Sequence, residues 1–143
     1  MTRLLLPALL LGFLVSGCAA TTTPVPLSEA KQAPMDRVLA FQMTGGDKTA
    51  TLTVIRDEGY AGGGCYNSVY INKVLAARLD VAEYARFYLE PGEIVLGSGS
   101  DPEGRWLCAF QTAYETQREI LLKPGEQNVF HLTLNHWGIL NIQ

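Results

Sequence analysis

The sequence has few of the residues that carry out metal, redox or nucleic-acid chemistry. Its 143 residues include two histidines and three cysteines, and no pair of cysteines has the C-x-x-C spacing typical of metal sites. Lys and Arg number 11 against 14 Asp and Glu, so the chain is acidic, with a net charge of −3. Without a basic patch, nucleic acid is not expected as a partner, and no metal or other cofactor is expected.

Long apolar runs are also absent, because the longest, residues 4–15, has twelve residues and a membrane-spanning helix needs about 20. This run follows Arg3 and precedes two small residues and Cys18, which is the order of parts in a secretory signal. Residues 15–18, Val-Ser-Gly-Cys, resemble the bacterial lipobox, whose cysteine is acylated, as with palmitate, and becomes the first mature residue. The alternatives are an ordinary secretory signal with a chance cysteine and a buried core helix.

The lipobox resemblance implies a signal peptide (residues 1–17), a lipid-anchored linker rich in Pro and Thr (18–34) and one domain (35–143). The linker has three prolines after the cysteine and no apolar periodicity, so we expect an extended tether that reaches at most about 50 Å. Ala19 stands where an Asp often marks inner-membrane retention in enteric-type bacteria. This favours anchoring in the outer membrane, with the domain facing the periplasm.

Cys65 and Cys108 are left as a pair once Cys18 carries lipid. In an oxidising compartment an even pair of cysteines predicts a disulfide. Two buried thiols or a metal site are the alternatives, and the spacing lends no support to a metal site.

Helical periodicity is scarce after residue 43, and short alternating runs of apolar and polar residues take its place. Residues 35–43 fit either a short N-terminal helix or a strand, residues 97–105 have the polar composition of a loop, and Asn72 starts a hairpin turn. Pro-Gly-Glu turns follow at 91–93 and 124–126. The pattern predicts an all-β fold, an antiparallel β-sandwich of about eight strands. The expected strands are 50–55, 66–71, 74–80, 83–89, 94–96, 106–110, 115–122, 128–134 and 139–142.

Five segments carry a resemblance to a known group of proteins. Residues 53–57, 62–66, 69–72, 77–80 and 91–93 together resemble small proteobacterial lipoproteins that carry a domain of unknown function. More distantly, the hairpin and the Pro-Gly-Glu turn resemble PEGA-type and carboxypeptidase-regulatory-like sandwiches. That resemblance implies a transthyretin-like or immunoglobulin-like topology and no catalytic residues.

Acidic and histidine side chains are the candidates for acid–base chemistry. His131 and His136 are five residues apart, which places them on opposite faces of a strand and argues against a shared metal. The acids lie in turn-like places where acids are common, so the chain is not expected to be an enzyme. An envelope hydrolase would need two of these side chains to meet in a cleft. The candidates are Asp57, Glu58, Asp80, Asp101, Glu103, His131 and His136.

Glycine-rich segments flank both cysteines of the expected disulfide, at residues 62–64 and 97–105. The disulfide would bring them together, with Tyr60, Tyr66, Arg105 and Trp106 at the edge of the patch. Aromatic residues and Arg carry much of the energy of protein interfaces, and loops on a rigid sandwich often bind partners. We therefore expect a recognition patch here; the alternative is that these side chains only pack on the disulfide.

The expected function is a lipid-anchored binding or structural module whose partner is an envelope protein or a glycan. A secretion-system assembly lipoprotein or an inhibitor of an envelope enzyme is the alternative among binding proteins. An envelope hydrolase is the alternative among enzymes.

Replacing Cys18 tests the anchor. Cys18→Ala should move the protein from the membrane fraction to the soluble fraction, because the acylated side chain is removed. Fractionation with immunoblotting measures this, and unchanged recovery with membranes would refute the lipid anchor.

Overall fold

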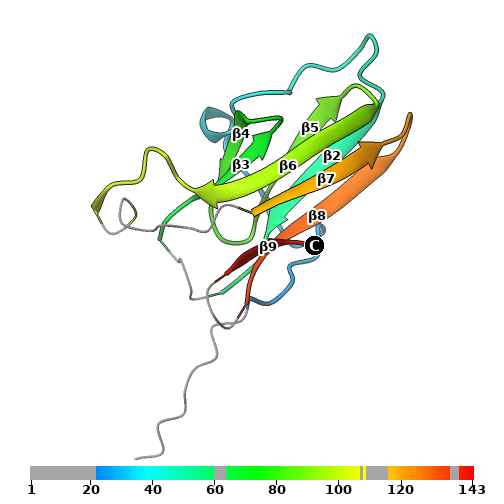
Figure 1. Cartoon of the computed structure of the whole chain (residues 1–143). Helices are drawn as coiled ribbons and strands as arrows, with labels where there is room; N and C mark the ends of the chain where they lie inside the picture. The colour runs from blue at the N-terminus through cyan, green and yellow to red at the C-terminus, as the bar shows by residue number, and fades with distance from the viewer. Residues whose placement is uncertain (1–21, 60–63, 107, 109–115, 136–138) are drawn as a thin grey trace, which may run out of the picture.

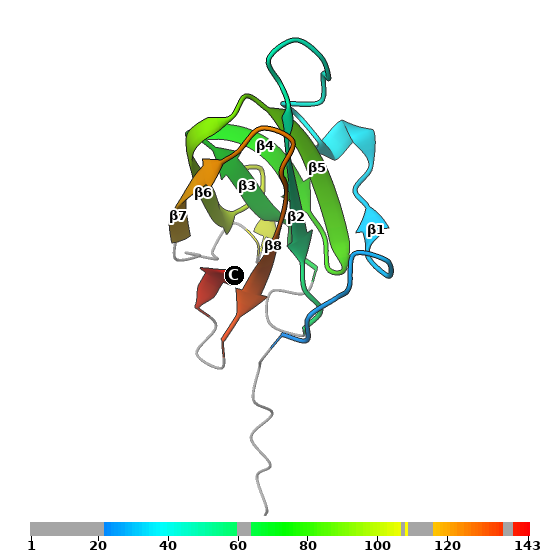
Figure 2. The same cartoon turned by 90° about the vertical axis from the view of Figure 1, so that its right-hand side faces the viewer.

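The computed structural model of the chain describes residues 22–59, 64–106, 108, 116–135 and 139–143. Within these ranges nine β-strands form two sheets that pack face to face, as Figures 1 and 2 show. The predicted all-β sandwich is confirmed. No helix in the described ranges is long and apolar enough to cross a bilayer.

The strands divide into a five-stranded and a four-stranded sheet. The first has the order β1-β5-β2-β8-β9 and the second the order β4-β3-β6-β7. Most pairs are antiparallel, as predicted, but β2 pairs with β8 in parallel, and β1 with β5. The strands of the first sheet are β1 (Lys31–Gln32), β5 (Glu83–Leu89), β2 (Ala50–Arg56), β8 (Gln127–Leu134) and β9 (Leu140–Ile142). Those of the second are β4 (Val74–Leu79), β3 (Asn67–Ile71), β6 (Gly92–Ser100) and β7 (Thr116–Leu122).

The core lies between the sheets and is built from alternate residues of the strands. Leu52 and Val54 of β2 and Phe87 of β5 are fully buried, facing apolar residues of the other sheet such as Val69 and Leu96. Each such side chain contributes about 1.5–3 kcal/mol when it leaves water. The period of two that predicted the strands therefore also selects the face that forms the core.

The turns have the backbone geometry that their residues favour. Asn72 and Lys73 join β3 to β4 and both have positive φ, 49° and 68°, so the predicted two-residue hairpin is confirmed. Gly92 and Gly125 of the two Pro-Gly-Glu turns also have positive φ.

Residues 22–34 pack on the sandwich, whereas we expected an extended tether there. Val25 and Ala33 are buried, β1 pairs with β5, and the Thr23 amide donates to the Glu58 carbonyl at 2.7 Å. Backbone hydrogen bonds hold this segment in place, and only two of its apolar side chains are buried. The sequence therefore shows no hydrophobic periodicity from which its packing could be predicted. Residues 22–34 therefore pack as part of the sandwich.

Three other local expectations differ from the structure. Residues 35–43 contain only a 3₁₀ turn, Met35–Arg37, and no α-helix. Gly97 to Ser100 belong to β6 and not to a loop. Gly97 pairs with Tyr70 of β3, and its lack of a side chain leaves room for the Tyr70 side chain. Trp106 and Cys108, the described residues of the expected strand 106–110, are not in a strand.

Candidate functional site

One end of the sandwich gathers the segments that were expected to form a site. We call it the disulfide end: β2, β4, β6 and β8 finish there, and β3 and β7 begin there. Arg56, the last residue of β2, donates to the carbonyls of Cys65 and Leu79, the latter at 2.9 Å. Burial lowers the pKa of this guanidinium. Arg56 therefore ties the two sheets together at this end.

Cys65 and Cys108 form the predicted disulfide, with their Cα atoms 5.4 Å apart. The bond joins Cys65, which lies just before β3, to Cys108 in the segment after β6, across a sequence separation of 43. In the chain-entropy model a closed loop of this size stabilises the fold by roughly 4 kcal/mol. The disulfide lies past the last pair of β3 with β6, Asn67 with Ser100, and links the chain before β3 to the chain after β6.

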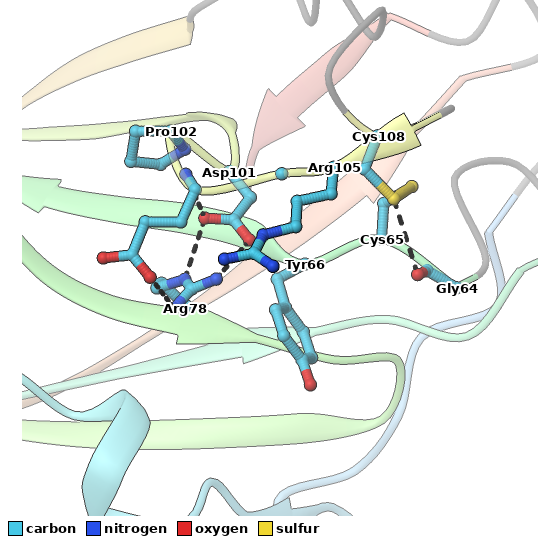
Figure 3. A pocket seen from close by; sticks show the side chains of 10 residues that line it. Gly64, Cys65, Tyr66, Arg78, Asp101, Pro102, Arg105 and Cys108 are labelled. Atoms are coloured by element: carbon cyan, nitrogen blue, oxygen red, sulfur yellow. Dashed lines mark hydrogen bonds and ion pairs between the residues drawn. A yellow bond between two sulfur atoms is a disulfide. The ribbon is translucent and has the colours of Figure 1, made fainter.

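An open cavity of about 750 Å³ lies beside the disulfide. Figure 3 shows the side chains that line it, among them Tyr66, Arg78, Asp101 and Arg105. Of the four residues expected at a recognition patch, Tyr66 and Arg105 are therefore brought together at this cavity. Trp106 follows Arg105 but points to solvent, with 86% of its surface exposed, and Tyr60 lies outside the described residues.

Arg78 of β4 forms the charged wall of the cavity. It donates to both carboxylate oxygens of Asp101, at 2.8 and 2.6 Å, and to Glu103 at 2.6 Å. The Asp101 side chain is almost fully buried, and its hydrogen bond with Arg78 raises the pKa of the guanidinium. The two-pronged contact fixes the segment after β6 to β4. Sequence reasoning missed Arg78, because nothing in the local pattern of β4 indicates a partner 23 residues away.

Tyr66 is held by two guanidinium groups. The Arg37 Cζ lies 4.4 Å from the ring centroid and the Arg78 Cζ lies 5.3 Å from it, both within cation–π range. Arg37 is fixed in turn by two hydrogen bonds to Glu83, at 2.7 and 2.6 Å, which raise its pKa. Arg37 was not expected at the site, since it lies far from Tyr66 in the sequence. The floor of the cavity is therefore preorganised.

Two of the acid–base candidates meet elsewhere at the same end. The His131 Nδ1 lies 2.6 Å from Asp57 Oδ1, which also accepts from the Val25 amide at 3.1 Å. The Asp57 side chain is completely buried, and its Oδ2 has no partner among the described residues. Neither residue lines the cavity. Asp57 therefore joins β2, β8 and the N-terminal segment.

Asp101 and Glu103 are a second pair of candidates that meet, and both line the cavity. Asp101 and Glu103 both contact Arg78, and the Asp80 amide donates to Glu83 at 2.8 Å. Glu58 is exposed, and His136 lies outside the described residues. Among the described side chains, no group of three His, Cys, Asp or Glu could hold a metal ion.

Comparison with protein-family models, curated proteins and solved structures finds no match to this chain. The fold and the site therefore define its class by themselves. It is an all-β sandwich protein with a disulfide and a charged cavity at one end.

Arg78→Met should lower the free energy of unfolding by about 2–4 kcal/mol, because it leaves the buried Asp101 carboxylate without its cation. Urea unfolding at neutral pH measures the change. The matched control is Arg86→Met on β5, whose side chain is exposed and should matter by no more than about 0.5 kcal/mol. Equal losses for the two variants would contradict the structural role of Arg78.

Proposed function

We propose that this protein is a lipid-anchored binding module of the bacterial envelope, held at the outer membrane and facing the periplasm, with the cavity at the disulfide end as its binding site. It acts by binding and not by catalysis, and it needs no cofactor. The observation that carries this proposal is the contrast between Arg78 and Arg105. Arg78 forms ion pairs with two carboxylates, those of Asp101 and Glu103. Arg105 is exposed, forms no ion pair with any described residue and extends over the cavity (Figure 3).

The chemistry of the cavity suggests what it would bind. Arg78 pairs with both Asp101 and Glu103, and the three carry one excess negative charge. The planar guanidinium of Arg105 and the edge of Tyr66 are left for a ligand. An Arg fork suits a carboxylate or a set of hydroxyl groups. An acidic segment of an envelope protein, or a glycan, fits both features.

The more specific roles stay proposals of the same class. A secretion-system assembly lipoprotein and an inhibitor of an envelope enzyme would both use a small anchored β-domain with a rigid binding surface. The resemblance to small proteobacterial lipoproteins supports the envelope setting without selecting between these roles.

Arg105→Glu should reduce recovery of the partner by about tenfold or more, the equivalent of at least 1.4 kcal/mol, because Arg at the centre of a patch is often a main source of binding energy. Cross-linking in the native envelope followed by pull-down measures recovery. Arg86→Glu is the matched control, since it makes the same charge change on an exposed strand position away from the cavity. Equal recovery with both variants would refute the cavity as the binding site.

An envelope hydrolase is the second candidate, favoured by the Asp57–His131 contact of 2.6 Å. A carboxylate that orients a histidine is the arrangement found in acyl hydrolases. The geometry favours a structural role instead, because Asp57 is fully buried, shares the same oxygen with the Val25 amide and does not line the cavity.

The two roles of His131 differ in what the purified protein does to substrates. We expect no release of product from p-nitrophenyl esters or from purified peptidoglycan, in wild type or in His131→Asn. Turnover by the wild type that disappears in His131→Asn would replace the binding function by a hydrolase.

A further inference from the structure

The point where the chain enters the domain is fixed at the disulfide end. The Thr22 amide donates to the Leu134 carbonyl at 3.2 Å, and the Leu134 amide donates to Thr22 Oγ1 at 3.0 Å. Thr22 also packs closely against Gly59, where an added Cβ would lie 2.9 Å from Thr22 Cγ2. Figures 1 and 2 both show this N-terminal segment beside the end of β8. The chain that leads back to Cys18 therefore leaves the domain at the disulfide end.

The length of chain before Thr22 limits how far the domain can stand from a lipid anchor. From Cys18 to Thr22 the chain advances four residues, which span at most about 14 Å when fully extended. The opposite end, which we call the turn end, carries Met43 and the turns at residues 90–92 and 123–126. A strand as long as β6, with nine residues, separates the two ends by about 30 Å. The disulfide end therefore lies nearest the lipid.

Apolar side chains are exposed at the same end. Trp106 has 86% of its surface exposed and follows the cavity residue Arg105. Ile139 is 40% exposed, and its amide donates to Oδ1 of Asn135, the residue after β8, at 2.9 Å. Trp is the side chain most typical of the interface between lipid headgroups and hydrocarbon. Of the nearby charged side chains, Arg78 contacts both Asp101 and Glu103, whereas Arg105 and Glu58 are exposed.

We propose that the disulfide end docks on the lipid bilayer, with Trp106 and Ile139 in the headgroup layer. This inference rests on the lipid anchor of the proposed function. It divides the predicted recognition patch, since Tyr66 and Arg105 serve the cavity and Trp106 contacts lipid. The cavity then lies at the level of the headgroups, so its ligand is met at the membrane surface and not deep in the periplasm.

Paramagnetic broadening tests the docking directly. The ¹⁵N-labelled lipidated protein is placed on nanodiscs of phosphatidylethanolamine and phosphatidylglycerol that contain a lipid with a gadolinium chelate on its headgroup. The amide signals of Trp106 and Ile139 should be lost, while that of Met43 at the turn end should remain, because broadening falls steeply with distance. Equal broadening at both ends, or loss of the Met43 signal alone, would overturn the docking.

A matched pair of variants separates docking from tethering alone. Trp106→Asp should reduce the difference in broadening between Ile139 and Met43, because a released domain reorients on its tether and no longer holds one end in the headgroup layer. Met43→Asp makes a similar change at an exposed position of the turn end and should leave Ile139 broadened. A difference between Ile139 and Met43 that is unchanged in Trp106→Asp would overturn docking through Trp106.

Whether the protein carries the lipid anchor is measured before these spectra are recorded. Intact mass shows whether acyl chains are attached, and co-elution with nanodiscs shows whether the protein is bound. A protein without acyl chains overturns both the anchor and the docking. An acylated, bound protein with equal broadening at its two ends overturns the docking alone.

Discussion

The Cys65–Cys108 disulfide is the constraint on which the candidate site depends. It links Cys65, just before β3, to Cys108 in the segment after β6, and so holds that segment against the start of β3. The same segment, which carries Asp101, Glu103 and Arg105, is also held by the hydrogen bonds that Arg78 donates to Asp101 and Glu103. Because the covalent bond restricts the unfolded chain as well, it contributes to stability and to the shape of the cavity together.

Buried charged side chains also hold distant segments together at the disulfide end. Arg56 contacts backbone carbonyls, Arg78 holds Asp101, and Asp57 holds His131 and the Val25 amide. Pairs of this kind add little net stability over well-packed apolar residues, but breaking one costs several kcal/mol because a charge is left alone. Their effect here is positional: each joins strands or segments that are distant in the sequence. The disulfide end is also the end at which the described chain begins, at Thr22.

The sequence predicted the strands well where alternation is strong. The runs that became β2, β5 and β8, and the hairpin at Asn72, follow from local pattern and turn chemistry. Prediction failed where local pattern is silent. Residues 22–34 are held by backbone hydrogen bonds with few apolar contacts, and Gly97 to Ser100 look like a loop but pair because β3 lies close above them.

The sequence by itself determined which residues alternate and where the chain turns, since these depend on local backbone preference. It also indicated which two cysteines could pair, since Cys65 and Cys108 remain once Cys18 is assigned to the lipobox. Only the tertiary structure decided that Arg37 and Arg78 meet at Tyr66, that Asp57 meets His131, and that Thr22 enters beside Leu134. The physical reason is that such contacts depend on strand order and register. The parallel pairing of β2 with β8 aligns Ile55 with His131, and no local pattern encodes that alignment.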